Sequence, residues 1–207
     1  MEIPCSGTGS LGTSFLLVGV GGQGTLLASN VLAHVGVKAG FDVKKAEVHG
    51  MAQRGGSVSS HIRWGDEIHS PLIGRGQADY LIALEKLETL RYVDMLRPRG
   101  SVLIGEMRIL PLSVSSGHDV YPSDEEIRRI VTQVTEDVHF VPSMRLAEQA
   151  GNTRAQNVVV LGALSTTIDR VPLATWLEVI AEWVPHRYLD VNVSAFEAGR
   201  KAGLLAE

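Results

Sequence analysis

The sequence contains one cysteine, Cys5, among 207 residues. An iron–sulfur cluster needs about four thiolates and a structural zinc site usually needs about two to four, so this chain alone can hold neither. The histidines lack the HxH and HExxH spacings of metal ligands, and we expect no metal site made by this chain alone; they stand at positions 34, 49, 61, 69, 118, 139 and 186. A lone thiol near one end is typical of a reducing cytosol, and we expect a cytoplasmic protein.

Positive charge is also scarce. The chain has 19 Lys and Arg against 23 Asp and Glu, a net charge of −4, and no block of basic residues. A general nucleic-acid binder needs clustered Lys and Arg to displace counterions from phosphates. We therefore expect no nucleic-acid partner.

Residues 3–37 contain no Asp, Glu, Lys or Arg. A membrane span needs about 20 predominantly apolar residues, whereas this stretch is interrupted repeatedly by glycine and by polar residues such as Gln23 and Asn30. The chain begins Met1-Glu2 rather than with the positive charge of a signal peptide. We expect no membrane partner and no signal sequence.

What the chain does contain is enough apolar sequence for a core. Hydrophobic residues make up 44% and charged residues 20%, which suits a chain of this length that buries its own core. We predict a single domain over residues 14–207. Residues 1–13 are small, polar and rich in glycine, and we expect a flexible N-terminal arm there.

Hydrophobic runs predict strands that alternate with helices. The expected strands are residues 15–18, 41–48, 57–64, 79–84, 101–104 and 138–141. The expected helices are residues 23–38, 86–96, 144–150, 156–168, 173–184 and 187–204, and Ser123 with Glu126 has capping-box spacing before a further one. This order predicts an α/β fold: a Rossmann-like, mostly parallel sheet with helices on both faces and a helical C-terminal third.

Two helices of that C-terminal third invite different expectations. Residues 156–168 are nearly all apolar, so this helix is expected in the core. Trp176 and Trp183 are expected to be partly exposed in the isolated chain, where an apolar patch would mark a docking surface.

A glycine-rich turn follows the first expected strand. Gly19, Gly21 and Gly24 have the spacing Gly-x-Gly-x-x-Gly at the start of a helix, where unpaired N–H groups favour a phosphate. The alternative is that these glycines serve only the turn and its packing. The acid that would bind a ribose is poorly placed, since Asp42 should begin the second strand and Glu47 is equally typical of a surface charge.

The loop at residues 47–57 is the second candidate. If the crossover between the first two strands is parallel and right-handed, this loop leaves the same edge of the sheet as the glycine-rich turn. Arg54, Gly55 and Gly56 could then present a guanidinium and bare amides to a carboxylate, a phosphate or another protein's backbone. The alternative is a surface loop with a solvated arginine, and Arg75 is a weaker candidate of the same kind.

Common catalytic motifs are missing. No GxSxG elbow is present, Thr25 and Leu26 stand where a Walker A motif requires Lys and Ser or Thr, and Cys5 is a poor nucleophile so close to an end. The residues alone therefore indicate a Rossmann-like domain with an anion-binding edge and no catalytic apparatus.

Five segments of the sequence together resemble the gamma domain of 2-oxoacid:ferredoxin oxidoreductases. They are GVGGQGTLLASNVLA, EVHGMAQRGGSVSSHIR, ADYLIALE, NTRAQNVVVLGAL and VNVSAFEAG, and the resemblance covers nearly the whole chain from Ser14. A separate gamma domain of this length is most similar to the small (beta) subunits of the indolepyruvate enzymes. Gamma subunits for pyruvate, 2-oxoglutarate and 2-oxoisovalerate share the same segments.

The resemblance implies a reaction that converts an aryl 2-oxoacid, coenzyme A and oxidised ferredoxin to an acyl-CoA, carbon dioxide and reduced ferredoxin. It implies that thiamine diphosphate, Mg and [4Fe-4S] clusters belong to a large partner subunit, and that this chain holds no cofactor and is inactive alone. Ferredoxin would be reached through the complex. This chain would help to form or close the site, with no catalytic residue of its own.

Coenzyme A, the implied co-substrate, carries phosphates that suit the two glycine-rich segments. The candidate contacts are Gly19, Gly21, Gly22, Gln23, Gly24, Arg54, Gly55 and Gly56. Replacing Gly21 by alanine is expected to damage folding or assembly, because a Cβ would crowd the turn.

Two other functions stay open. The chain could be an autonomous dinucleotide-binding oxidoreductase that uses the glycine-rich turn for pyrophosphate. It could also be a nucleotide-sensing or scaffold subunit that adds nothing to turnover.

Overall fold

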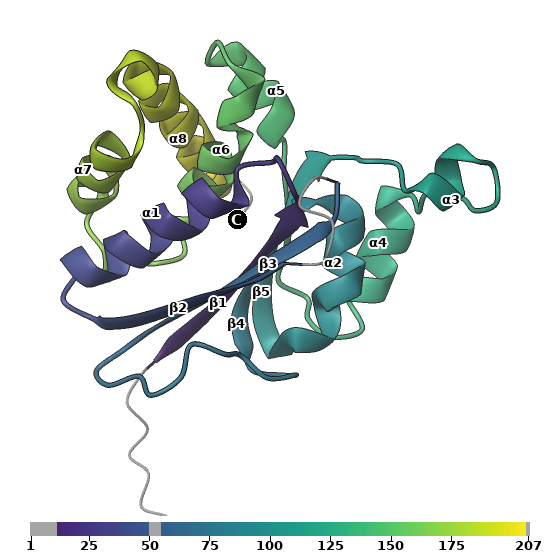
Figure 1. The fold of residues 1–207 in the computed structure, drawn as a ribbon, viewed down its shortest axis with the longest axis horizontal. Helices are drawn as coiled ribbons and strands as arrows, with labels where there is room; N and C mark the ends of the chain where they lie inside the picture. The colour runs from purple at the N-terminus through teal and green to yellow at the C-terminus, as the bar shows by residue number, and fades with distance from the viewer. Residues whose placement is uncertain (1–11, 50–54, 206–207) are drawn as a thin grey trace, which may run out of the picture.

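The computed structural model describes residues 12–49 and 55–205, which form one six-stranded sheet with helices packed against it (Figure 1). The strands are β1 (Thr13–Val20), β2 (Asp42–His49), β3 (Ser57–Gly65), β4 (Ala78–Glu85), β5 (Leu96–Met107) and β6 (Val138–Val141). The α-helices are α1 (Thr25–Lys38), α2 (Lys86–Tyr92), α3 (Leu112–Ser115), α4 (Asp124–Val131), α5 (Ser143–Gln149), α6 (Gln156–Leu164), α7 (Leu173–Trp183) and α8 (Leu189–Leu204). Short 3-10 helices are η1 (Val93–Met95), η2 (Thr153–Ala155) and η3 (His186–Tyr188).

The strands lie in the order β2-β3-β1-β4-β5-β6. β1, β4, β5 and β6 pair in parallel, whereas β3 pairs antiparallel with both β1 and β2. All strands except β3 therefore run in the same direction. The connection from β2 to β3 spans only residues 50–56, which is too short for a parallel crossover, so the chain reverses there. The expected mostly parallel α/β sheet is confirmed.

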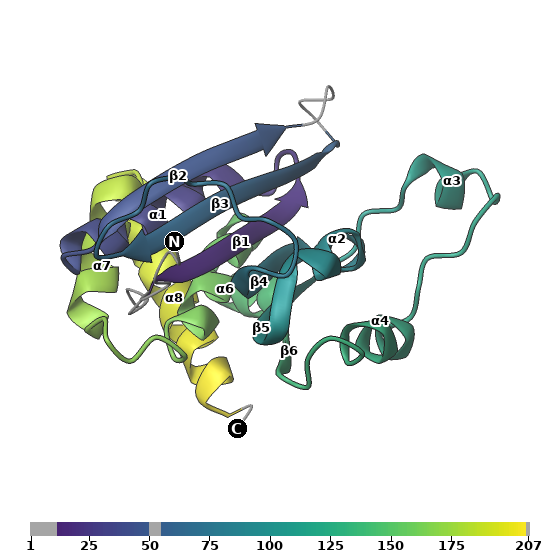
Figure 2. The ribbon, with the colours of Figure 1, turned by 90° about the horizontal axis from the view of Figure 1, so that it is seen from below.

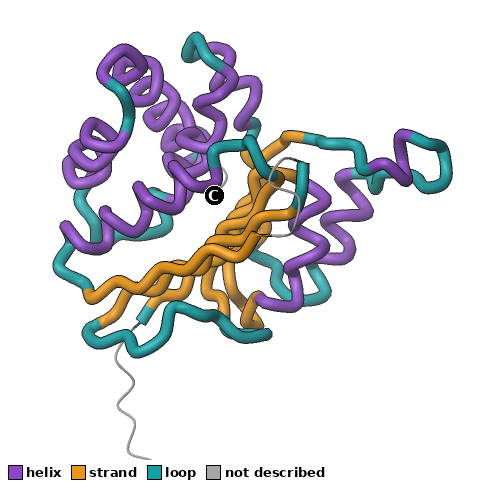
Figure 3. Tube along the Cα trace, viewed as in Figure 1, coloured by secondary structure: helices purple, strands orange, loops and turns teal. Residues whose placement is uncertain are grey.

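Helices cover both faces of the sheet, as the sequence predicts (Figures 1 and 3). Successive residues of β1 point to opposite faces. Phe15 and Leu17 pack into the core beneath α1, α6, α7 and α8, whereas Leu16 and Val18 pack with Ile127 and the helices α2 and α4.

Glycines allow α6 and α8 to pack closely in the C-terminal third. A Cβ atom on Gly162 of α6 would collide with the backbone of Phe196, and one on Gly199 of α8 would collide with the backbone of Val159. Every residue of α6 is buried. The expectation that this apolar helix lies in the core is confirmed.

Trp176 was expected to be partly exposed, and this is wrong. Its side chain is fully buried and lies 5.8 Å from the ring of Phe196, because α7 packs against both α1 and α8. Trp183 is half-buried, with its ring 4.4 Å from the ring of His34. The expected partial exposure of Trp183 is therefore confirmed, whereas Trp176 belongs to the core.

Several helix boundaries also differ from expectation. α2 ends at Tyr92, short of the expected Leu96, and β5 already begins at Leu96. β5 continues past Pro98. Arg99 adopts a left-handed backbone conformation there (φ 62°), and the register of β5 against β4 shifts between Leu96 and Ser101. α1 begins at residue 25 rather than 23, and α6 ends at residue 164 rather than 168.

The N-terminal boundary is only partly described. β1 begins at Thr13, so the strand takes in the last residue of the expected arm. Residues 1–11 lie outside the described part of the chain, and the division at residue 14 stays a prediction. None of the described helices combines the length and the apolar character needed to span a membrane.

Residues 108–122, here called the projecting arm, connect β5 to α4. The arm carries the unexpected helix α3 and extends away from the rest of the molecule, which Figure 2 shows most clearly. The helix it leads to begins with the predicted capping box, in which Ser123 and Glu126 exchange hydrogen bonds.

Candidate functional site

The glycine-rich turn follows β1, at the place in the sheet where two neighbouring parallel strands connect onward to opposite sides. β1 and β4 are parallel neighbours, but the chain after β1 continues to β2 on one side and the chain after β4 continues to β5 on the other. Such a divergence leaves a crevice at the carboxyl ends of the two strands, where ligands of open α/β sheets bind. Here the crevice lies beside Val20 and Glu85, the last residues of β1 and β4.

Two glycines of the turn adopt the left-handed backbone conformation. Gly22 has φ 105° and Gly24 has φ 80°. Gly24 is the N-cap of α1 and supplies no capping side chain, and the first turn of α1 has no acidic residue. The N–H groups at the start of α1 therefore keep their partial positive charge for an anion.

Gly19 and Gln23 have an internal role in the turn. The Val20 backbone N–H donates to Gln23 Oε1 at 2.7 Å, and Gln23 Nε2 donates to Leu84 O at 3.4 Å and to Met107 Sδ at 2.7 Å. A Cβ on Gly19 would lie 2.7 Å from Gln23 Oε1, so glycine is needed there. The contact of Gly19 and Gln23 with a ligand remains a prediction.

The second glycine-rich segment meets the turn directly. Gly21 N donates to Gly56 O at 2.9 Å, and Gly55 N donates to Gly21 O at 3.4 Å. The expected convergence of the two loops is therefore confirmed. Arg54 lies outside the described residues, so its role stays a prediction.

A cleft of about 610 Å³ opens on the α1 side of the turn. Its walls are the turn itself, the end of β5, and the chain that enters α6. Leu27, Met107, Ile109 and Met144 supply its apolar surface. The predicted site residues Gly21, Gly22, Gln23 and Gly24 line this cleft.

Asn157 joins the two helix starts that border the cleft. Its Nδ2 donates to Gly24 O at 2.9 Å, and its side chain is 2% exposed. A Cβ on Gly24 would lie 2.5 Å from that same Nδ2, so the close approach requires glycine. Asn157 thus holds the start of α6 against the start of α1.

Arg154 brings positive charge to the cleft. Its side chain is exposed and lines the cavity, while its backbone N–H donates to Asn152 Oδ1 at 3.0 Å. Arg154 and Asn157 both lie in the segment NTRAQNVVVLGAL, which carries part of the family resemblance, but neither is among the site residues predicted from the sequence. The available signal was a polar run directly before an all-apolar helix.

Gln156 leaves a buried acceptor in the wall of the cleft. The side chain is 4% exposed, and its Nε2 donates to Met107 Sδ at 3.3 Å. Its Oε1 has no hydrogen-bond partner within the described part of the chain. A buried acceptor without a partner costs stability, so this oxygen is suited to an N–H group of a ligand.

A second cavity, of about 230 Å³, lies on the α2 side of the same turn. Glu85 is 1% exposed there and accepts hydrogen bonds from Ile109 N and Glu88 N, each at 3.0 Å, and from the hydroxyl of Tyr121. Burial, and then the adjacent Glu85 carboxylate, raise the pKa of Tyr121. Glu85 thereby ties both ends of the projecting arm to the end of β4.

Glu88 adds a second buried carboxylate to this cavity. It is 2% exposed and accepts hydrogen bonds from Ser57 Oγ at 2.5 Å and Arg91 Nη1 at 2.9 Å. Burial raises the pKa of Glu88 above its ordinary value, and the interactions with Ser57 and Arg91 oppose this increase. This side of the turn is therefore acidic.

The acids considered for ribose binding lie elsewhere or are already paired. Asp42 begins β2 at the opposite edge of the sheet, where its hydrogen bond with Lys44, and then that from Ile68 N, lower its pKa. Glu47 pairs with Lys45 at 2.6 Å. Arg75 precedes β4, also at the opposite edge, and pairs with Asp94. None of these three residues lines the cleft.

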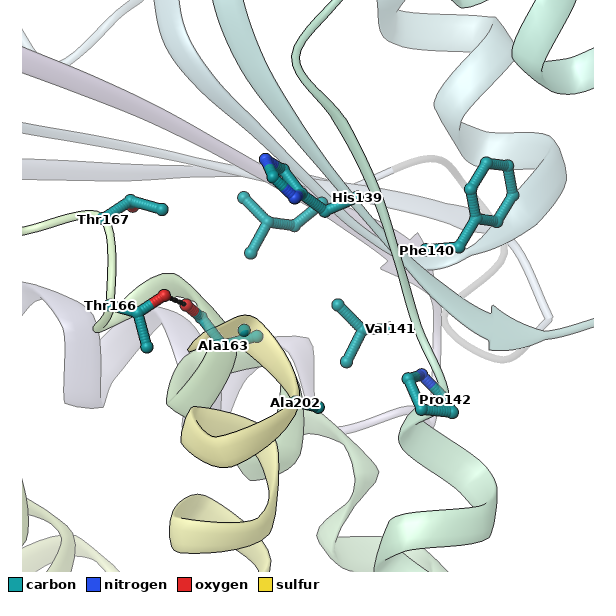
Figure 4. A pocket seen from close by; sticks show the side chains of 10 residues that line it. His139, Phe140, Val141, Pro142, Ala163, Thr166, Thr167 and Ala202 are labelled. Carbon is teal, nitrogen blue, oxygen red and sulfur yellow. Dashed lines mark hydrogen bonds between the residues drawn. The ribbon is translucent and has the colours of Figure 1, made fainter. Parts of the chain in front are cut away.

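A small apolar cavity of about 50 Å³ lies between β6 and the ends of α6 and α8 (Figure 4). Its polar groups are Thr166, Thr167 and His139, whose Nε2 lies 2.5 Å from Asp137 Oδ1. This cavity is remote from the glycine-rich turn. Within the described residues, no group of three or more His, Cys, Asp or Glu side chains is placed to hold a metal ion.

Comparison with known proteins gives consistent matches along the chain. A sequence model of the family described as pyruvate ferredoxin/flavodoxin oxidoreductase matches residues 14–202. The indolepyruvate oxidoreductase subunit IorB of Pyrococcus horikoshii is 41% identical over 192 residues, covering 91% of this chain and 95% of the relative. The 2-oxoglutarate synthase subunit KorC of Methanothermobacter marburgensis is 27% identical over 188 residues, covering 89% and 93%.

A solved structure shares the fold. The gamma subunit of a keto/oxoacid ferredoxin oxidoreductase from Geobacter sulfurreducens superposes with a TM-score of 0.69 at 22% identity. The match covers 93% of this chain and 99% of that subunit.

Proposed function

Because this chain belongs to the pyruvate ferredoxin/flavodoxin oxidoreductase family, we propose that it is the small subunit of a cytoplasmic indolepyruvate:ferredoxin oxidoreductase. The complex would convert an aryl 2-oxoacid and coenzyme A to an acyl-CoA and carbon dioxide, with the electrons passed to ferredoxin. Identity to the indolepyruvate relative is 41%, against 27% for the 2-oxoglutarate relative, and this difference favours the aryl substrate.

The redox chemistry is assigned to a large partner subunit. The described residues contain no group of three or more His, Cys, Asp or Glu side chains placed to hold a metal ion, so they do not fit an iron–sulfur cluster. We assign thiamine diphosphate, Mg and the [4Fe-4S] clusters to that subunit. No catalytic step is assigned to this chain.

The role we assign to this chain is to bind the phosphates of coenzyme A in the cleft. One observation carries this assignment: the uncapped start of α1 and the exposed Arg154 border the same cavity, and no acidic side chain occupies the first turn of α1 or α6. Oriented N–H groups and a guanidinium are the groups that phosphates prefer. Gln156 Oε1 would accept an N–H of the amide-bearing part of the ligand.

Reconstitution tests the assignment to the enzyme. The chain is produced with the large subunit encoded in the same organism, and reduction of a redox dye is measured with indolepyruvate and with 2-oxoglutarate. We expect activity only with both subunits present, and a higher kcat/KM for indolepyruvate. Activity of the small chain alone, or a preference for 2-oxoglutarate, would contradict the proposal.

Substitution tests the cleft. Arg154→Ala in the reconstituted complex is expected to raise the KM for coenzyme A about tenfold with little change in kcat, since a charge-assisted hydrogen bond to phosphate contributes about 1.5–3 kcal/mol. Arg145→Ala is the matched control, because Arg145 is exposed on the neighbouring α5 and does not line the cleft. Arg54→Ala tests the loop in the same assay. Equal KM values for Arg154→Ala and the control would exclude the cleft.

A further inference from the structure

We propose that the projecting arm, residues 108–122, is the element that docks onto the large subunit, with Leu112 and Val120 inserted into an apolar recess of that subunit. The inference rests on the proposed function for the existence of the partner, and it adds which surface of this chain meets it.

The arm exposes apolar side chains to an unusual extent. Leu112 is 83% exposed and Val120 is 85% exposed, and Leu110 at the root of the arm is 48% exposed. Among the other large hydrophobic side chains of the described residues, only Leu205, at 78%, comes near these values. Single exposed apolar residues need no explanation, but a group of them on one extension marks an interaction site.

The central part of the arm, residues 109–118, contains no Asp, Glu, Lys or Arg, although 20% of the whole chain is charged. Depletion of charged residues distinguishes the core of a protein interface from an ordinary solvent-exposed loop. The composition therefore favours an apolar, uncharged recess as the surface that receives the arm.

The arm is held in place before any partner binds. Within it, the N–H groups of His118 and Asp119 both donate to Ser113 O, at 2.9 and 3.1 Å, and Ser115 Oγ donates to Pro111 O at 2.7 Å. These bonds fold the tip without burying its apolar side chains.

The root of the arm is fastened separately, by a buried carboxylate. Glu85 accepts hydrogen bonds from Ile109 at the start of the arm and from Tyr121 at its end, and the guanidinium of Arg108 lies 4.3 Å from the centre of the Tyr121 ring. A segment ordered in this way loses little further conformational entropy when it binds, which favours affinity.

A second copy of this chain is a poor recipient for the arm. The enclosed apolar cavity beside β6 has a volume of about 50 Å³ (Figure 4), whereas a cavity that accommodates benzene has about 150 Å³. The two larger cavities beside the glycine-rich turn are lined by charged groups, namely Arg154 in one and Glu88 and Arg91 in the other. Leu112 would have to displace water from those groups.

The position of the arm also suits a partner that completes the site. Ile109, at the root, lines both the cleft and the acidic cavity. A large subunit that holds the arm would therefore lie beside the cleft in which we place coenzyme A.

The test uses the full chain and the large subunit. Leu112→Ser and Val120→Ser are each expected to weaken the complex about tenfold or more, since burial of such a side chain contributes about 1.5–3 kcal/mol. Affinity is measured by titration of labelled small subunit with large subunit. The melting temperature of the isolated chain should be unchanged, because both side chains are exposed.

Leu205→Ser is the matched control, since it removes an apolar side chain of similar exposure from the end of α8. Wild-type affinity in both arm variants would overturn the docking inference while the proposed function stands. Failure of the wild-type chains to associate would overturn both. A complex that depends on the arm but has no activity with any 2-oxoacid would support docking and refute the function. Arm variants that abolish a homodimer and leave the large-subunit affinity unchanged would overturn the inference in favour of a second copy.

Discussion

The two cavities on either side of the glycine-rich turn share the side chain of Ile109 but differ in charge. The cleft on the α1 side has two helix starts, Arg154 and no carboxylate in its lining. The cavity on the α2 side contains the buried carboxylates Glu85 and Glu88. The same turn is therefore attractive to an anion on one side only.

This difference shows why a glycine pattern is insufficient to locate a ligand. The spacing of Gly19, Gly21 and Gly24 predicts a turn and a helix start, but not which side of the turn is open to phosphate. Groups from β4, α2, η2 and α6 decide that question. Each of the following variants alters one side and should leave the other side unchanged.

Gly24→Ala is expected to have the largest effect. It places a Cβ 2.5 Å from Asn157 Nδ2 at a left-handed position (φ 80°), and the strain and the clash together should cost about 3 kcal/mol of unfolding free energy. Gly22→Ala is the matched control, since its φ is 105° but a Cβ there would meet nothing within 4 Å. It should cost only about 1 kcal/mol. Equal losses of unfolding free energy in the two variants, measured by urea denaturation, would show that the Asn157 side chain moves aside freely.

Asn157→Ala should cost about 2 kcal/mol of unfolding free energy, because it removes the partly buried hydrogen bond to Gly24 O. The starts of α1 and α6 would then separate, and we expect the Kd for coenzyme A in the complex to rise. Asn192→Ala removes a comparable bond from a buried asparagine of α8 to Tyr188 O, at the N-cap of that helix. It should lower stability to a similar extent without changing that Kd, and a parallel change in both variants would contradict the role of Asn157.

Tyr121→Phe acts on the acidic side. It removes a donor to Glu85 and an acceptor for Leu87 N, so the free energy of unfolding should fall by about 1 to 1.5 kcal/mol. The Kd for coenzyme A should not change, because Tyr121 does not line the cleft. Tyr80→Phe removes an exposed hydrogen bond to Thr167 O. It is the control and should lower the free energy of unfolding by less. A Tyr121→Phe variant with altered coenzyme A affinity would show that the two cavities are coupled.

Glu88→Gln is expected to have the smallest effect, and one that depends on pH. Because burial raises the pKa of Glu88, the folded state binds more protons than the unfolded state between the ordinary and the raised pKa, and stability falls as pH rises through that window. Glu88→Gln removes the titrating group, so the variant does not lose stability in this way as pH rises. Its stability relative to wild type should therefore increase with pH, by less than about 1 kcal/mol in total.

Melting temperatures at a series of pH values from about 4 to about 8 would measure this difference. Asp42 and Glu126 have lowered pKa values, and they contribute stability that is lost as pH falls in both proteins, so they cancel in the comparison. A difference independent of pH would mean that Glu88 titrates normally.

Much of the fold followed from local patterns. The strand at residues 138–141, the capping box of Ser123 and Glu126, and the all-apolar α6 were all predicted and are observed. Each depends on neighbours within a few residues along the chain, through alternation, helical spacing or a side chain that bonds to the backbone three residues away.

Other features needed the packed structure. The burial of Trp176 depends on α8, and the end of α2 at Tyr92 depends on how β5 pairs with β4. α3 has only four residues and lies on the projecting arm, so periodicity could not indicate it.

The order of residues along the chain was enough to predict the alternating elements, the glycine-rich turn and the meeting of two glycine-rich loops at one sheet edge. These features follow from backbone conformation and strand direction. The charge on each side of that turn came from folding alone. Asn157 reaches Gly24 across 133 positions of sequence, and Glu85 meets Tyr121 across 36. Contacts over such separations exist only once helices and sheet have packed, since no local preference of either residue brings it to its partner.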